Sequence, residues 1–154
     1  MRDALVIADS SCLILLAKIE ELEILKGIYK RILVTKEIAG EFGNDLPEWI
    51  EVKEVANKTL QSLFEEILDM GEASALTLAF ETKDCTVILD DLKARKTAAK
   101  MNIKVTGTIG VIVKAKTENR IPSAKAVFEK ILETDFQISD RILKQAIHLA
   151  GEQP

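Results

Sequence analysis

The chain has 154 residues, 47% of them hydrophobic and 30% charged, which is enough apolar material to bury a core and excludes a disordered protein. Its longest apolar run, Cys12 to Ala17, is too short to span a bilayer, and the apolar stretch near the start is too short for a secretory signal. The net charge of −4 argues on its face against nucleic-acid binding, and a single histidine, His148, with two distant cysteines argues against a zinc site. We therefore expect a cytoplasmic globular protein with no membrane partner, whose chemistry depends on carboxylates.

Strands and helices are predicted to alternate along the first third of the chain. Residues 4–8 form a continuous apolar run, typical of a strand covered on both faces, and a helical pattern follows as far as Ile19. A short helix is predicted over 20–29, a strand over 32–34 and a helix over 35–42, before Gly43 and Pro47 break the chain. Residues 50–55 predict a weaker strand at the edge of the sheet.

The alternation continues to about residue 120 and is followed by helices alone. Helices are predicted over 57–68 and 73–80, then a buried strand over 86–89, a basic helix to about Met101, a strand over 103–105 and a helix after Gly107. Residues 122–151 predict two helices, the second capped by Ser139. This order predicts an α/β fold of three layers, α/β/α, with a mostly parallel sheet. We expect one domain over 1–154, with 121–154 a helical C-terminal extension.

Carboxylates recur where the predicted strands end. Asp9 follows the first strand, Glu41 lies in the helix after the second, Glu72 opens the helix before the strand 86–89, and Asp90 and Asp91 end that strand. In open α/β sheets, ligands bind outside the carboxyl ends of the strands. Adjacent carboxylates repel one another, and a hard cation such as Mg²⁺ or Mn²⁺ relieves that repulsion and prefers oxygen ligands.

Each of these acids has a plainer interpretation. Asp9 and Asp91 could cap the helices that they precede, and Asp69 and Glu72 have the spacing of a capping box. Glu41 could be one of many solvated surface acids.

The charges are strongly segregated along the chain. Residues 37–91 hold 14 acids and 3 bases, whereas residues 92–120 hold 8 bases and 1 acid. A low overall charge can therefore hide a basic surface that binds phosphates. The alternative is a solvated helix face with a cationic bias.

Five motifs in the same order resemble the PIN-domain family, roughly over residues 4–120. The first two are an apolar strand, an Asp and a hydroxyl pair (Val6 to Leu16), and a strand followed by a helix bearing Glu (Ile32 to Phe42). The other three are similar to segments of a prokaryotic PIN-like branch, GE-x-x-A from Gly71, DD-x-x-AR from Asp90 and GT-x-G from Gly107.

The resemblance implies a metal-dependent ribonuclease, similar to the toxins of type II toxin–antitoxin modules. Asp9, Glu41, Glu72 and Asp90 would hold Mg²⁺ or Mn²⁺, with Asp91 the second choice of its pair, and Ser11 and Thr108 would hydrogen-bond the carboxylates or a metal-bound water. Lys93, Arg95, Lys96 and Lys100 would contact the RNA backbone, although Arg95 could instead pair with Asp91. The resemblance also implies a homodimer and an antitoxin protein as a partner.

Two departures from the family pattern leave open which of Asp90 and Asp91 binds the metal, and the acidic balance of the chain keeps other functions open. Many PIN nucleases have Asp where Glu72 stands, and Thr-x-Asp where this chain has Asp90-Asp91. One alternative is a catalytically silent PIN-fold module that binds nucleic acid or protein. Another is a phospho-acceptor receiver-like domain, although its acidic pair usually follows the first strand. A dinucleotide-binding function is disfavoured, since no G-x-G-x-x-G follows that strand.

Overall fold

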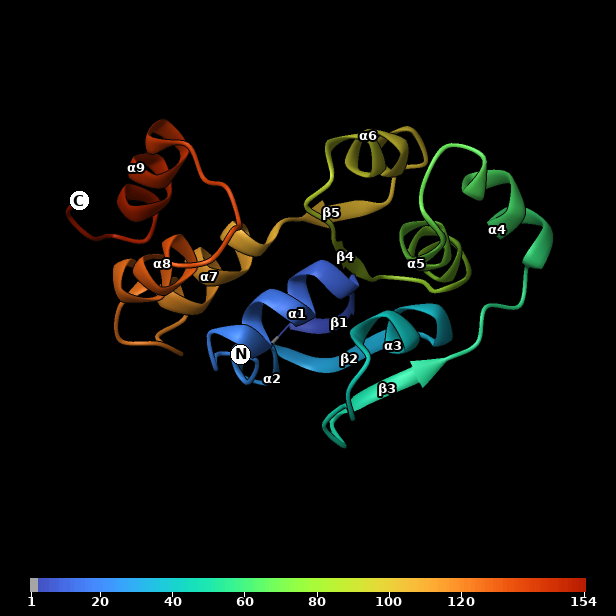
Figure 1. The fold of residues 1–154 in the computed structure, drawn as a ribbon, viewed down its shortest axis with the longest axis horizontal. Coiled ribbons are helices and arrows are strands. Elements are labelled where there is room, and N and C mark those ends of the chain that lie inside the picture. The colour runs from blue at the N-terminus through green and yellow to red at the C-terminus, as the bar shows by residue number, and fades with distance from the viewer. Residues whose placement is uncertain (1–2) are drawn as a thin grey trace.

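Five parallel strands form the centre of the fold (Figure 1). The computed structural model describes residues 3–154. The strands are β1 (Asp3–Ala8), β2 (Tyr29–Thr35), β3 (Ile50–Lys53), β4 (Thr86–Ile88) and β5 (Lys104–Thr106). Their order in the sheet is β3-β2-β1-β4-β5. The sheet is therefore parallel throughout, and β3 lies at an edge as its weak pattern predicted.

The central strand is the most deeply buried. Val6, Ile7 and Ala8 of β1 are each 0% exposed, because β2 and β4 pair with both edges of this strand and helices cover its faces. Ile7 lies opposite Leu33 of β2 and Val87 of β4. A strand with no exposed face needs apolar residues at consecutive positions rather than alternate ones, which explains the unbroken apolar run.

Within residues 3–154, nine helices surround this sheet and confirm the predicted α/β architecture. They are α1 (Ser10–Lys18), α2 (Ile24–Ile28), α3 (Lys36–Phe42), α4 (Lys58–Glu65), α5 (Met70–Glu81), α6 (Leu92–Lys100), α7 (Thr108–Thr117), α8 (Ala124–Leu132) and α9 (Asp140–Leu149). Figure 1 shows α7, α8 and α9 grouped at one end of the molecule and α4 at the other.

Three predicted helix boundaries were wrong. The helix expected over 57–68 ends at Glu65. The helix expected over 20–29 is only five residues long, because Glu20 has a positive φ of 60° and Tyr29 already pairs with β1 as the first residue of β2. The helix expected from Ala73 begins at Met70, because Asp69 accepts a capping hydrogen bond one turn earlier than the apolar pattern indicates.

The C-terminal region is helical, as predicted. The side chain of Ser139 accepts the N–H of Ile142 and caps α9, and Ser123 caps α8 in the same way through Ala126. Both helices pack on α7. None of the helices within the described residues combines the length and the apolar character needed to cross a bilayer.

Buried hydroxyl groups join the start of α3 to the start of α5. Thr35, the last residue of β2, accepts the N–H of Ile38 at 3.1 Å, and its Oγ1 lies 2.6 Å from Oγ of Ser74. Ser74 donates its own hydrogen to the carbonyl of Gly71 at 2.7 Å, so the hydrogen between the two hydroxyls comes from Thr35. Thr35 and Ser74 are both 0% exposed, and this link fixes how the two helices approach the sheet.

We predict that Thr35→Val lowers the free energy of unfolding by about 1–3 kcal/mol, because it removes a helix cap and leaves buried polar groups unpaired while keeping the side-chain shape. Urea unfolding with an unchanged m-value would measure this loss. The matched control is Thr117→Val, since Thr117 is exposed and donates only to a carbonyl one turn back in its own helix. A loss no larger than that of the control would show that the buried link does not stabilise the fold.

Candidate functional site

The candidate site lies where the order of the strands reverses. The chain passes from β1 outward to β3 on one side of the sheet, then crosses to β4 and β5 on the other, so β1 and β4 are neighbours at the switch point. Asp9 follows β1 directly and Asp90 lies two residues beyond β4. The backbone N–H of Asp9 donates to the carbonyl of Ile88 at 3.3 Å, which places the two strand ends side by side. Crevices of this kind are where α/β sheets bind ligands.

Asp9 occupies a capping position without capping. It is the N-cap residue of α1, yet its side chain accepts no capping hydrogen bond, and it is only 5% exposed. The Ser11 hydroxyl lies 3.4 Å from Oδ2 of Asp9, which is a weak contact. Asp91 behaves differently, because its Oδ2 accepts the N–H of Ala94 at 2.9 Å and caps α6. The capping interpretation therefore holds for Asp91 and not for Asp9.

Burial and neighbouring charge make Asp9 hold its proton more tightly. The pKa of Asp9 is raised from 3.8 to about 6, chiefly by burial and also by the carboxylates of Asp69 and Glu41. Hydrogen bonds from the backbone N–H of Ser10 and the hydroxyl of Ser11 act in the opposite direction. The pKa of Glu72 is likewise raised from 4.5 to about 7, chiefly by burial and also by the charges of Asp69, Asp91 and Asp9. These acids, which come from separate segments, therefore share one electrostatic environment.

Glu41 is held over the first turn of α5. Ser10 donates its hydroxyl hydrogen to Oε1 of Glu41 at 2.7 Å, which joins the start of α1 to α3. A Cβ atom on Gly71 would lie 2.8 Å from the carboxylate carbon of Glu41, closer than nonbonded atoms approach. Gly71 thus leaves room for this carboxylate, which gives the glycine of the GE-x-x-A segment a physical role.

Glu72 is both structural and part of the acidic group. Its backbone N–H donates to Oδ1 of Asp69 at 2.8 Å, and its Oε1 accepts the N–H of Asp69 at 3.4 Å, which confirms the capping box. This leaves Oε2 of Glu72 outside the capping box.

Asp90 is held by Thr108 at the start of α7. Its Oδ1 accepts the N–H of Thr108 at 2.8 Å, and its Oδ2 accepts the hydroxyl hydrogen of Thr108 at 2.6 Å. Gly107 is the N-cap residue and has no side chain to cap the helix, so Asp90 supplies the acceptor from another strand. The contact predicted for Thr108 is therefore present. A carboxylate has about four lone-pair sites, so two accepted bonds leave Asp90 able to bind a cation.

The carboxylate oxygens of the site are the ligand type that a hard cation prefers, although they do not surround a single point. None of the ion pairs that join residues 3–154 includes Asp9, Glu41, Glu72, Asp90 or Asp91. In the same residues, no three Asp, Glu, His or Cys side chains converge closely enough to hold an ion on their own. An ion such as Mg²⁺, which keeps several waters when it binds, would therefore be held in part through water.

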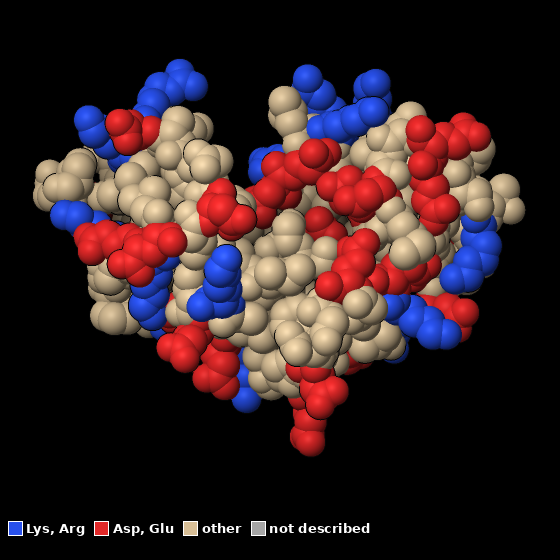
Figure 2. Space-filling model, in the orientation of Figure 1, with Lys and Arg blue, Asp and Glu red and all other residues tan. Residues whose placement is uncertain are grey.

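A basic helix stands beside the acidic group. In Figure 2, acidic side chains gather over the middle of the face and basic side chains lie next to them, over the helix that Figure 1 labels α6. Lys93, Lys96 and Lys100 are exposed on α6, as is Arg95. The guanidinium of Arg95 donates to the carbonyl of Leu89 at 3.3 Å, so it points back toward the end of β4. No ion pair of Arg95 with Asp91 is found within residues 3–154, which weakens that alternative.

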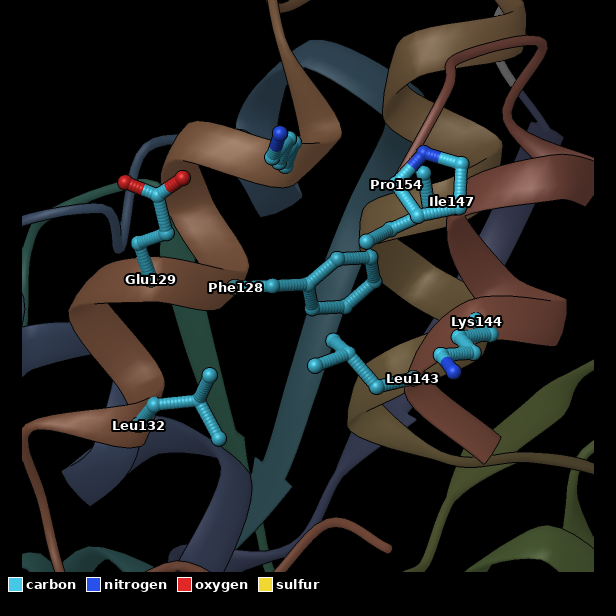
Figure 3. Close-up of a pocket in the computed structure, with 8 residues that line it drawn as sticks. Phe128, Glu129, Leu132, Leu143, Lys144, Ile147 and Pro154 are labelled. Atoms are coloured by element: carbon cyan, nitrogen blue, oxygen red, sulfur yellow. The ribbon is translucent and has the colours of Figure 1, made fainter. Parts of the chain in front are cut away.

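A separate apolar hollow lies far from this chemistry. It has a volume of about 170 Å³ and lies between α8 and α9, where Phe128, Leu143 and Ile147 face one another and Lys144 and Glu129 stand at its rim (Figure 3). None of the predicted site residues lines it. This hollow is therefore a candidate contact surface and not the catalytic site.

Two members of the site were not predicted. Ser10, and not Ser11, donates the strong hydrogen bond to a carboxylate. Asp69, which the sequence marks only as a helix cap, also raises the pKa of Asp9 and Glu72. The hydroxyl pair and the D-x-x-E spacing signal that these residues matter locally, but not which carboxylate each one meets.

The chain matches the model of a known family. The family model DUF3368, described as a PIN domain, matches residues 5–152. No curated protein and no solved structure matches the chain.

We predict that the metal-free protein loses stability as the pH rises from about 4 to about 7. In this window the folded protein still binds protons that the unfolded chain has released, because the pKa values of Asp9 and Glu72 are raised on folding. For Asp9 the loss is about 3 kcal/mol, at about 1.4 kcal/mol per pKa unit. Urea unfolding at a series of pH values would measure it.

The Asp9→Asn variant is the comparison for this measurement. It should be more stable than the wild type above pH 6, with a smaller dependence on pH, and Mn²⁺ should stabilise the wild type at pH 8 more than the variant. Equal pH profiles for the two proteins would contradict the raised pKa of Asp9.

Proposed function

Because the chain belongs to the PIN-domain family, we propose that it is a metal-dependent ribonuclease that hydrolyses phosphodiester bonds in RNA. PIN domains are generally nucleases, which supports a hydrolase at the coarse level. The observation that best supports the proposal is the buried, uncapped carboxylate of Asp9. A buried carboxylate that caps nothing, among other carboxylates and outside the ion pairs described above, is costly unless a cation binds there.

Asp9, Glu41, Glu72 and Asp90 would hold one or two Mg²⁺ or Mn²⁺ ions, with Asp91 the second choice because it already caps α6. A bound divalent ion lowers the pKa of a coordinated water and neutralises charge on the scissile phosphate. This chemistry suits a chain with a single histidine, His148, which lies on α9 and lines no part of the site.

The residues around the carboxylates fix their positions. Ser10 orients Glu41, and Thr108 orients Asp90 with two hydrogen bonds. Ser11 lies at a distance where it could donate to Asp9 or to a water beside it. Preorganised ligands of this kind lower the cost of gathering charge at the reacting phosphate.

The exposed side chains of Lys93, Arg95, Lys96 and Lys100 would contact the RNA backbone. Such contacts fix the position of a strand without reading its sequence. They also offset the overall negative charge of the chain near the site, which would otherwise repel RNA.

A catalytically silent PIN-fold binding module is the second candidate. The observation that favours it is that no three potential ligands converge within the described residues. The family match favours the PIN interpretation over a receiver-like domain.

Partners are proposed from the exposed apolar side chains. Leu63 of α4 is 58% exposed and Leu149 of α9 is 68% exposed. We propose that these faces meet a second copy of the chain or an antitoxin, in a cytoplasmic toxin–antitoxin module.

We predict that Asp9→Asn lowers the rate of RNA cleavage by about 10²- to 10³-fold, because it removes one ligand charge and keeps the side-chain size. Labelled single-stranded RNA incubated with Mn²⁺, with Mg²⁺ and with EDTA would show whether cleavage needs a metal. Asp84→Asn is the matched control, since Asp84 is exposed just before β4, at the opposite end of that strand. Metal-independent cleavage, or equal loss in both variants, would contradict the proposal; binding without any cleavage would favour the silent module.

We predict that Gly71→Ala displaces Glu41 and lowers the cleavage rate by about 10²-fold, with little effect on stability. The new methyl group would overlap the carboxylate of Glu41, which is the end of a flexible side chain and can turn away without unfolding the protein. Gly40→Ala is the control, because a Cβ at Gly40 would meet no atom within 4 Å. Single-turnover cleavage rates and melting temperatures of the two variants would test this prediction. Full activity of Gly71→Ala would show that Glu41 takes no part in cleavage.

A further inference from the structure

A second hollow adjoins the carboxylates. It has a volume of about 620 Å³, and Figure 2 shows the surface hollowed between the parts that belong to α9 and α6. One wall is formed by the start of α6, by β5 and by the first turn of α7, and the other by residues 136–139 with Ile142 of α9. A volume of this size admits a small organic ligand such as a nucleoside.

The hollow is continuous with the candidate site. Asp90 and Gly107 line it, and Asp90 is the carboxylate that Thr108 holds in place. Arg95 lines the same hollow, and its guanidinium lies near both of them, since a Cβ on Gly107 would be 2.7 Å from Nη1 of Arg95 and 2.9 Å from Oδ1 of Asp90. A group bound in this hollow would therefore lie beside whatever reacts at the carboxylates.

The lining combines apolar side chains with groups that can hydrogen-bond, as a nucleobase requires. Six of the thirteen lining residues have apolar side chains, and they are Leu92, Val105, Ile109, Phe136, Ile138 and Ile142. Thr106, Gln137 and Ser139 add uncharged groups that can hydrogen-bond the edge of a base. The carboxylate of Asp90 would repel an anion placed inside. Arg95 is the cation at the edge, where it could meet a phosphate outside the hollow.

Phe136 separates this hollow from another one. The neighbouring hollow has a volume of about 460 Å³ and is lined by Ser11, Ile14, Lys18 and again Phe136 and Gln137. Ser11 belongs to the candidate site, and Lys18 lines the hollow together with Asp135, to which its ammonium group is paired at 3.9 Å. Phe136 therefore lines two hollows, one that includes Asp90 and one that includes Ser11, whose hydroxyl lies 3.4 Å from Oδ2 of Asp9.

The segment that carries Phe136 is held at both ends. The backbone N–H of Phe136 donates to the hydroxyl of Thr134 at 3.1 Å, and Thr134 donates to the carbonyl of Ile131 at 2.6 Å. At the other end, Ser139 caps α9 through the N–H of Ile142. Phe136 is partly buried against the core, so its ring is placed before any ligand arrives and little entropy is lost on binding.

We propose that the hollow between α6 and residues 136–142 binds one nucleobase of single-stranded RNA, next to the phosphodiester that is cleaved. The base stacks on Phe136, and Arg95 contacts the adjoining phosphate. Unstacked bases of single-stranded RNA bind aromatic side chains in this way, and the stack tolerates any base. This inference rests on the proposed ribonuclease function and adds a positioning residue to it.

The test measures RNA binding by fluorescence anisotropy in the Asp9→Asn background, where the strand stays intact. A short single-stranded RNA is compared with strands that carry one abasic nucleotide at each position in turn. We expect one abasic position to weaken binding about tenfold, and Phe136→Ala to weaken binding of the intact strand by a similar factor. The two losses should not add, because both remove the same stack.

The Phe80→Ala variant is the matched control, since Phe80 is 58% exposed at the end of α5 and lines neither hollow. Phe136→Leu keeps apolar packing and replaces Phe136→Ala if the alanine variant melts early. Fully additive losses, or unchanged binding in both Phe136 variants while the wild type still cleaves RNA, would overturn the inference alone. No RNA binding or cleavage by the wild type would overturn the proposed function with it.

Discussion

Mutual repulsion among carboxylates is the constraint to which the rest of the site responds. The sheet order brings the ends of β1 and β4 together, so Asp9 and Asp90 must lie at one crevice, and α3 and α5 add Glu41, Asp69 and Glu72. Burial also removes the hydration that stabilises an ionised carboxylate, and this loss is the largest cause of the raised pKa values of Asp9 and Glu72. Proteins keep such arrangements at functional sites, where the cost in stability is repaid by binding or chemistry.

The surroundings of the site limit this cost without neutralising the charges. Ser10 and Thr108 donate hydrogen bonds to Glu41 and Asp90, which stabilise charge locally and leave the net charge of the group unchanged. Gly71 supplies space rather than a contact. The nearby cations of α6 are exposed and form no ion pair with the acids within the described residues, so the group stays free to bind a cation while the flank stays free to bind phosphate.

Strands, helices and the acids at their ends could be predicted from the sequence, because apolar runs and helix caps are local signals. The different environments of Asp9 and Asp91 could not be predicted from the sequence. Both precede a helix in the same way, and only the packing of other segments decides that one caps and the other is buried uncapped. No sequence pattern marks Phe136 as a site residue. The segment between α8 and α9 that carries it lies beside the site only because these two helices pack on α7. Tyr29 shows the same limit at a boundary, since pairing with β1 overrides the helical pattern that leads up to it.

The sheet order also decides when the site can exist during synthesis. Ala8 lies next to Ile88, so the strand that carries Asp9 waits for a partner made 80 residues later. Asp90 in turn is oriented by Thr108, which follows β5. A ribosome that has released only β1 to β3 therefore exposes Asp9 and Glu41 alone, with neither the second wall of the crevice nor the basic helix beside them. Because of this strand order, the complete crevice can form only after most of the chain has been translated.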